Sequence, residues 1–175
     1  ALGLAPNSGE IRIGLAAART AQDEGDKAIA ELQAVLDRAP AWLDGHEHLA
    51  QLLSTQGRAN EATSSLEKAL ASFPKAQPLW ETLLRVQLRR ENYASLKAIV
   101  ERARSAGVRS PQFAVYDAIH SAELDEDVYP RTLFADAPPQ VDAALGRWRI
   151  RHLLRVAAVD AALPFIDGAL QEGSQ

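Results

Sequence analysis

The sequence repeats itself with a period of about 34 residues, and this period constrains the fold more than any other feature. Residues of the same kind recur at this spacing: Leu15, Leu49 and Leu83; Ala28 and Ala62; Leu32 and Leu66; Leu36 and Leu70; Pro40 and Pro74. A period between about 20 and 50 residues is typical of proteins in which one small unit of secondary structure stacks on copies of itself. Hydrophobic residues make up 47% of the 175 residues, which is enough to bury a shared core.

The pattern of each copy predicts two helices joined by a tight turn. In the middle copy the first helix is predicted from about Asp44 to Thr55, with apolar side chains recurring every three or four residues along one stripe. Gly57 follows it, as is usual after a helix C-terminus. The second helix is predicted from about Asn60 to Ser72, and Pro74 ends it. Because the connection is so short, the two helices are expected to pack antiparallel.

These positions resemble the tetratricopeptide repeat, whose pattern is W-x2-L-G-x2-Y, then A-x3-F, then P, at the same period. The corresponding residues here are His46, Leu49, Ala50, Leu53, Ala62, Leu66 and Pro74. The next copy keeps Trp80 and Leu83 but has Leu84 and Gln87 where the pattern has a small and an aromatic residue. The resemblance covers about residues 10–108. It implies a solenoid in which the first helix of each pair lines an inner groove that holds peptides or helices.

Beyond residue 107 the period weakens, although helices are still predicted. They are expected to start at Ser110-Pro111 with a stripe of Phe113, Tyr116, Ile119 and Ala122, then after Asp127, over about Gln140–Val156, and after Asp160. We therefore predict an all-α fold. It is a right-handed α-solenoid of about five antiparallel helix pairs in a single domain over residues 1–175, with regular repeats over about 10–108 and degenerate pairs over about 110–172.

Charge and composition exclude several classes of protein. The 19 Lys and Arg against 23 Asp and Glu give a net charge of −4, whereas an overall basic nucleic-acid-binding protein is positive. No apolar run approaches the roughly 18 residues that span a membrane, and no secretory signal is present, so we expect a cytoplasmic protein. The lack of cysteine excludes thiolate nucleophiles and thiolate zinc sites. The lack of methionine suggests a piece of a longer protein.

Side chains that bear chemistry are scattered along the sequence. His46 and His48 are two residues apart on a predicted helix and project in different directions, so they cannot share a metal ion. His46 is assigned to packing, because it occupies the position of Trp80 one repeat later. His120 and His152 lack any metal-binding spacing. We therefore expect no catalytic residues, no metal and no cofactor, and we predict that the chain is not an enzyme.

One segment is locally basic. Arg147, Arg151 and Arg155 lie on one stripe of a predicted helix, beside Trp148. Such a stripe could contact the phosphates of a nucleic acid. Because the chain as a whole is acidic, we interpret it as solvated surface and expect no nucleic-acid or membrane partner.

The predicted function is a protein–protein interaction scaffold that binds a peptide or partner segment in the concave groove. The candidate groove residues lie opposite the packing stripes of the first helices: Glu47, His48, Gln51, Thr55, Glu81, Thr82, Arg85 and Arg89. Related repeats that bind C-terminal carboxylates do so with cations and amides, and Glu47, His48 and Glu81 argue against that clamp here. Arg85 and Arg89 are one turn apart and can pair with an acidic peptide. An exposed terminal repeat would permit a homodimer.

A second function, from a different class, is a docking or regulatory arm of a larger enzyme. The segments 129–134, 138–139 and 151–154 resemble bacterial tetratricopeptide regions that precede a 2-oxoglutarate/iron oxygenase domain. The H-x-D…H iron-binding triad of those oxygenases is absent from this sequence. On this alternative, catalysis would belong to a domain beyond Gln175.

Overall fold

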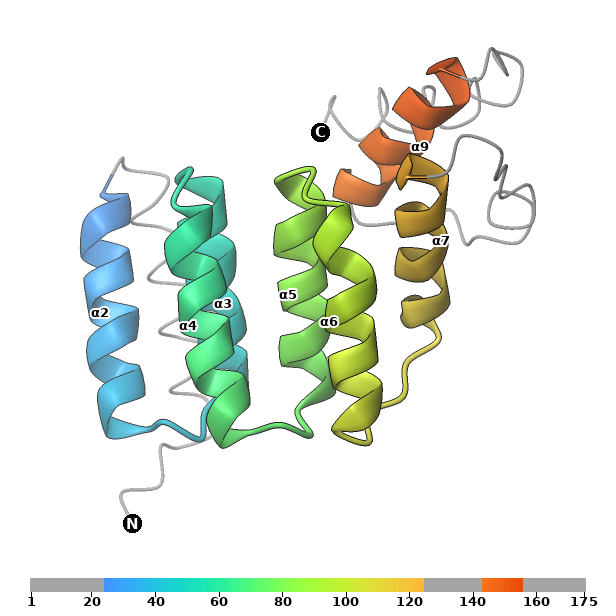
Figure 1. The fold of residues 1–175 in the computed structure, drawn as a ribbon. Coiled ribbons are helices and arrows are strands. Elements are labelled where there is room, and N and C mark those ends of the chain that lie inside the picture. Colours follow the sequence, from blue (N-terminus) through green and yellow to red (C-terminus); the bar gives the residue numbers. More distant parts are fainter. Residues whose placement is uncertain (1–23, 125–142, 156–175) are drawn as a thin grey trace. The chain divides into compact units, whose positions relative to one another are not determined.

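The computed structural model describes residues 24–124 and 143–155, and every regular element in these ranges is an α-helix (Figure 1). The predicted all-α class is confirmed for this part of the chain. The backbone forms two compact units, residues 1–124 and 125–175. The single-domain organisation stays a prediction, and the helices predicted after Asp127, after Asp160 and at the start of the first copy lie outside the described residues. None of the described helices is both long and apolar enough to cross a membrane.

The helices of the first unit reproduce the period of the sequence in their boundaries. They are α2 (Gly25–Arg38), α3 (Leu43–Thr55), α4 (Ala59–Ser72), α5 (Gln77–Arg89), α6 (Ala94–Ser105) and α7 (Gln112–Leu124). Moving α2 along the sequence by one period gives the bounds of α4, and moving α3 gives those of α5. The two helices predicted for the middle copy each begin one residue earlier than expected.

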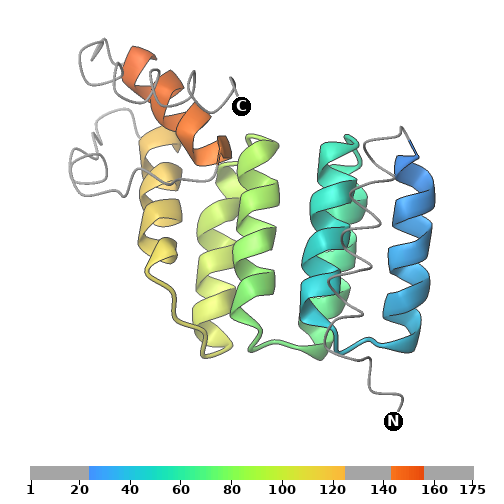
Figure 2. The same ribbon diagram turned by 180° about the vertical axis from the view of Figure 1, so that it is seen from behind.

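Consecutive helices run antiparallel and form two layers. Helices α2, α4 and α6 lie in one layer and α3 and α5 in the other, as the front and back views show (Figures 1 and 2). Helix α3 packs against α2, α4 and α5, and α5 packs against α3, α4 and α6. Of the positions predicted to face inward, Leu49, Ala50, Leu53, Ala62, Leu66, Ala69 and Leu70 are buried, whereas Phe73 is only half-buried. Small alanines on facing helices allow the backbones to approach closely.

The turns inside the pairs α3–α4 and α5–α6 each contain one residue with left-handed backbone. Gly57 has a φ of 74°, and Glu91, at the same position one repeat later, has a φ of 58°. After each of them the chain folds back, so that the amide of Arg58 donates to the carbonyl of Leu53 and the amide of Asn92 donates to that of Gln87. This is the Schellman arrangement, which satisfies carbonyls at a helix C-terminus. Its left-handed position favours glycine, so Glu91 is strained there.

The turn between pairs also repeats. The amide of Ala39 donates to the carbonyl of Val35, and one repeat later the amide of Phe73 donates to that of Ala69. Pro40 and Pro74 follow these residues, and a proline cannot continue a helix because it lacks an amide donor. Two different turns, each recurring at the same spacing, therefore stack the helices from α2 to α6. The turn from α6 to α7 differs from the other turns between pairs, because it contains Gly107 with a left-handed φ of 84°.

The strain at Glu91 gives a test of the turn. We expect Glu91→Gly to raise the free energy of unfolding by about 1 kcal/mol, because glycine adopts the left-handed conformation without the steric cost that other residues bear. Conversely, Gly57→Ala should lower it by about the same amount. Denaturant unfolding monitored by circular dichroism measures both changes. Glu91→Ala removes the same carboxylate but keeps the strain, so a gain as large as that of Glu91→Gly would contradict the assignment.

Candidate functional site

The structure places the eight predicted groove residues on α3 and α5, but in different environments. Gln51 and Thr55 of α3 are exposed; Glu47, His48, Glu81, Arg85 and Arg89 are half-buried; and Thr82 of α5 is buried. Thr55 donates its hydroxyl to the backbone carbonyl of Leu52, 2.8 Å away. We call the seven accessible residues, which leave out Thr82, the α3/α5 face.

The prediction that Thr82 faces away from the core was wrong. Its exposed fraction is only 2%, because α5 lies between α3, α4 and α6 and is buried almost all round. Its hydroxyl donates to Glu47 Oε2 of α3 at 3.3 Å. Thr82 therefore connects two neighbouring first helices and is not available to a ligand.

Glu47 is the electrostatic centre of the α3/α5 face. Burial raises the pKa of its carboxyl group above the ordinary value, the hydrogen bond from Thr82 lowers it, and the nearby Asp44 raises it. The positive fields of Arg85 and His48 act in the opposite direction to burial and lower the pKa. The net direction is upward, so loss of water around the carboxylate outweighs these partners.

Glu81 occupies the same position as Glu47 one repeat later and has a similar role. Its Oε1 accepts hydrogen bonds from the hydroxyl of Ser110 at 2.6 Å and from the side-chain amide of Gln77 at 2.8 Å. Ser110 lies just before α7, so Glu81 joins α5 to the next first helix of the series. The two glutamates of the face are thus anchored to neighbouring repeats.

The opposite layer is joined by an ion pair that the sequence analysis missed. Arg102 of α6 donates two hydrogen bonds to Glu67 of α4, at 2.8 and 2.6 Å. The guanidinium carbon lies 5.2 Å from the centre of the Trp80 ring, in a cation–π arrangement. The pair lowers the pKa of Glu67 and raises the pKa of Arg102. The available signal was a pair of opposite charges one repeat and one residue apart, the same spacing that separates Glu47 from Thr82.

His46 has the structural role that its position predicted. Its Nε2 lies 2.9 Å from the backbone carbonyl oxygen of Pro40 and donates to it, as the indole Nε1 of Trp80 donates to that of Pro74 at 2.8 Å. His46 and the ring of Phe73 are 6.5 Å apart between centroids. Within the described residues, no three His, Asp or Glu side chains are grouped so that they could hold a metal ion.

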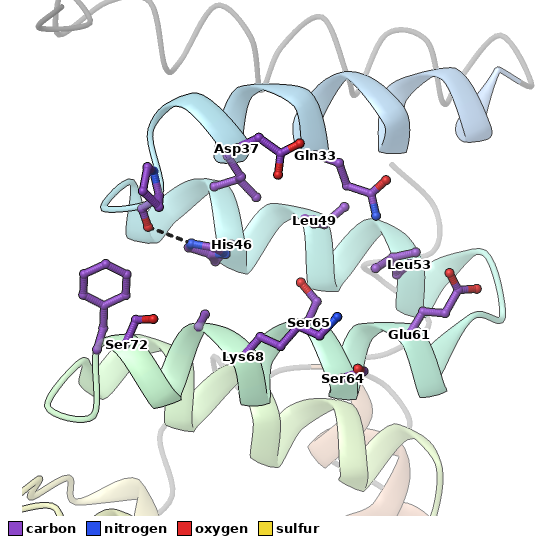
Figure 3. Close-up of a pocket in the computed structure, with 14 residues that line it drawn as sticks. Gln33, Asp37, His46, Leu49, Leu53, Glu61, Ser64, Ser65, Lys68 and Ser72 are labelled. Atoms are coloured by element: carbon purple, nitrogen blue, oxygen red, sulfur yellow. Dashed lines mark hydrogen bonds between the residues drawn. The ribbon is translucent and has the colours of Figure 1, made fainter.

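A groove opens between α2 and α4, with α3 as its floor (Figure 3). Its volume is about 650 Å³. Gln33 and Asp37 line it from α2, and Ser64, Ser65 and Lys68 line it from α4. Leu49 and Leu53 form the floor, and Pro40, His46 and Phe73 complete one end. This α2/α4 groove lies in the layer opposite to the predicted site and was not expected from the sequence.

The second unit contributes one described helix, α9 (Ala143–Arg155). Arg147 and Arg151 are exposed, as the predicted basic stripe requires, whereas the side chain of Arg155 lies outside the described residues. Trp148 and His152 are buried and stack with their ring centroids 5.0 Å apart. Arg149 is also buried, and desolvation lowers the pKa of its guanidinium. Helix α9 therefore has a packed face beside its basic one.

No protein-family model, no curated protein and no solved structure matches the chain.

The raised pKa of Glu47 makes stability depend on pH. The folded state holds the proton more tightly than the unfolded state, so the free energy of unfolding should fall as the pH rises from the ordinary glutamate pKa through the raised one. In Glu47→Gln this step is absent. We therefore expect the variant to be more stable than the wild type at pH 7, and the difference to shrink below about pH 4, where Glu47 is protonated.

Denaturant unfolding at a series of pH values measures that difference. Glu101→Gln removes an exposed carboxylate elsewhere and controls for the change in net charge. A stability difference between Glu47→Gln and the wild type that is the same at pH 3 and at pH 7 would show that burial does not perturb Glu47.

Proposed function

We propose that the chain is a non-catalytic protein-interaction scaffold of the tetratricopeptide type, a right-handed α-solenoid that binds a peptide or partner segment on the α3/α5 face. The observation that carries the proposal is the fixed juxtaposition of α3 and α5 at a spacing of one repeat. It brings the side chains of Glu47, His48 and Arg85 close together. Such a surface is built from two repeats at once and is suited to an extended partner.

Charge on this face favours an acidic partner. Both glutamates accept hydrogen bonds from neighbouring repeats, Glu47 from Thr82 and Glu81 from Ser110. Arg89 is half-buried, and none of the described residues forms an ion pair with it. Arginine offers paired donors with the geometry of a carboxylate or of successive peptide carbonyls. We therefore infer that Arg85 and Arg89 make the selective contacts.

The arginines can be tested without disturbing Glu47. Reversing the charge of Arg85 would place two carboxylates close together, so we choose Arg85→Gln with Arg89→Gln. Affinity purification with the intact chain and mass spectrometry supply a partner, and calorimetry measures its affinity. We expect the double variant to bind at least about tenfold more weakly at a nearly unchanged melting temperature, as truncated interface hot spots do.

Lys75→Gln with Lys97→Gln is the matched control. Both lysines are exposed, Lys75 between α4 and α5 and Lys97 on α6, and their loss changes the net charge by the same amount. If the control weakens the partner as much as the arginine variant, only overall charge matters. If the arginine variant binds as the wild type does, the α3/α5 face is not the site.

The docking arm of a larger oxygenase stays a prediction, because its segments 129–134 and 138–139 lie outside the described residues. The homodimer also stays a prediction. The open reading frame of the complete gene distinguishes an arm of an enzyme from a separate scaffold.

A further inference from the structure

The layer of α2, α4 and α6 has one groove between α2 and α4 and another between α4 and α6. Residues at equivalent positions of the repeat lie along both, but the first groove is open and the second is bridged. Gln33, Lys68 and His46 lie one repeat before Glu67, Arg102 and Trp80, respectively. The later set bridges α4 and α6, since Arg102 binds Glu67 twice and lies over the Trp80 ring. The earlier set occupies the corresponding positions between α2 and α4, where the groove is open.

The chemistry of the earlier set explains why the groove is open. Gln33 carries no charge, so it cannot form the ion pair that Glu67 forms. Lys68 is shorter in reach than an arginine and lacks its planar pair of donors. Among the described residues nothing forms a hydrogen bond or ion pair with the ammonium group of Lys68, and it is exposed. Figure 3 shows Gln33 and Lys68 on opposite sides of the space above α3.

The open groove also offers an apolar end. Phe73 is half-buried and faces His46, whose Nε2 donates to the carbonyl of Pro40. These three residues line the groove together with Lys68. A side chain that entered there would contact aromatic and proline carbon.

We propose that the α2/α4 groove is a second docking site, for a partner segment that sets an acidic side chain against Lys68 and an apolar side chain against Phe73 and Pro40. Charge complementarity carries the choice of an acidic group, because the cation equivalent to Lys68 one repeat later binds a carboxylate. The partner's carboxylate then replaces the one that Gln33 lacks. Ser64 and Ser65 line the same wall and can donate hydroxyl hydrogen bonds to the segment.

Two other carboxylates border the groove and restrict where an anion can bind. Glu61 accepts two hydrogen bonds from Arg58, each of 2.7 Å, which offset part of its charge, because the same guanidinium also binds Asp26. Asp37, on α2, remains exposed and repels an anion from its own side. The acidic group is therefore confined to the α4 side. This inference concerns a different layer from the α3/α5 face and does not depend on it.

A variant that closes the groove tests the proposal. Gln33→Glu with Lys68→Arg rebuilds the ion-pair residues of the closed groove and leaves His46 in the position of the tryptophan. A random library of short peptides displayed on phage is selected on the intact wild-type chain, and each enriched peptide is then measured on the variants. We expect a class of peptides, with Asp or Glu near Phe, Leu or Ile, that binds the closed variant and Lys68→Ala at least about tenfold more weakly. Lys97→Ala is the control and should leave this class unaffected.

The outcomes separate this site from the proposed one. Peptides that bind the α3/α5 face would bind the Arg85→Gln, Arg89→Gln variant more weakly than the wild type. They would bind the closed variant as tightly as the wild type. The α2/α4 proposal is overturned if no enriched peptide is sensitive to both Lys68→Ala and closure, or if the sensitive peptides carry no acidic residue. Denaturant unfolding at or above the wild-type midpoint shows that the closed variant has folded.

Discussion

Left-handed chain reversal at Gly57 and Glu91 is the constraint on which the helix pairs depend. Each reversal turns the chain from a first helix into the second helix of the same pair, with the same amide-to-carbonyl hydrogen bond closing the turn. Because the reversals are one repeat apart, α3 and α5 run in the same direction and in register. Residues about one repeat apart in sequence then become neighbours, as the contacts from Glu47 to Thr82 and from Glu67 to Arg102 show.

Because successive repeats are in register, positions where their residues differ show what each residue contributes to the contacts between helices. Trp80 and His46 donate to equivalent carbonyl oxygens, so exchanging one ring for the other preserves the local contact. The exchange does not preserve the ring face over which a guanidinium can lie in a cation–π contact. A tryptophan ring provides such a face better than other side chains. An ion pair closes the layer between α4 and α6. A groove remains between α2 and α4, where the residues at the equivalent positions differ. Binding surfaces in such a fold therefore arise from differences between copies.

The fold of residues 43–72 could be predicted to within one residue, because periodic apolar positions and turn residues are local signals. The site was harder to predict. The exposure of Thr82 depends on α3, a helix that lies one full repeat earlier in the sequence, so its helical face alone gave the wrong answer. The α2/α4 groove exists because Gln33 and Lys68 do not contact each other, and the sequence of one helix alone does not predict this. Comparing polar and charged residues about one repeat apart is the signal that would have found both.

Amide hydrogen exchange of the intact chain, resolved by residue with NMR, tests the central claim that the repeat fixes the register. The account predicts slow exchange in blocks that match α2 to α6. Faster exchange is expected at residues 59–60 and 93–94, where the amides at the start of α4 and α6 are not used by the turn hydrogen bonds, and again at residues 75 and 77, so that the profile of residues 43–72 overlies that of residues 77–106. A profile without this correspondence between successive repeats, or protection that continues through residues 59–60 and 93–94, would contradict it.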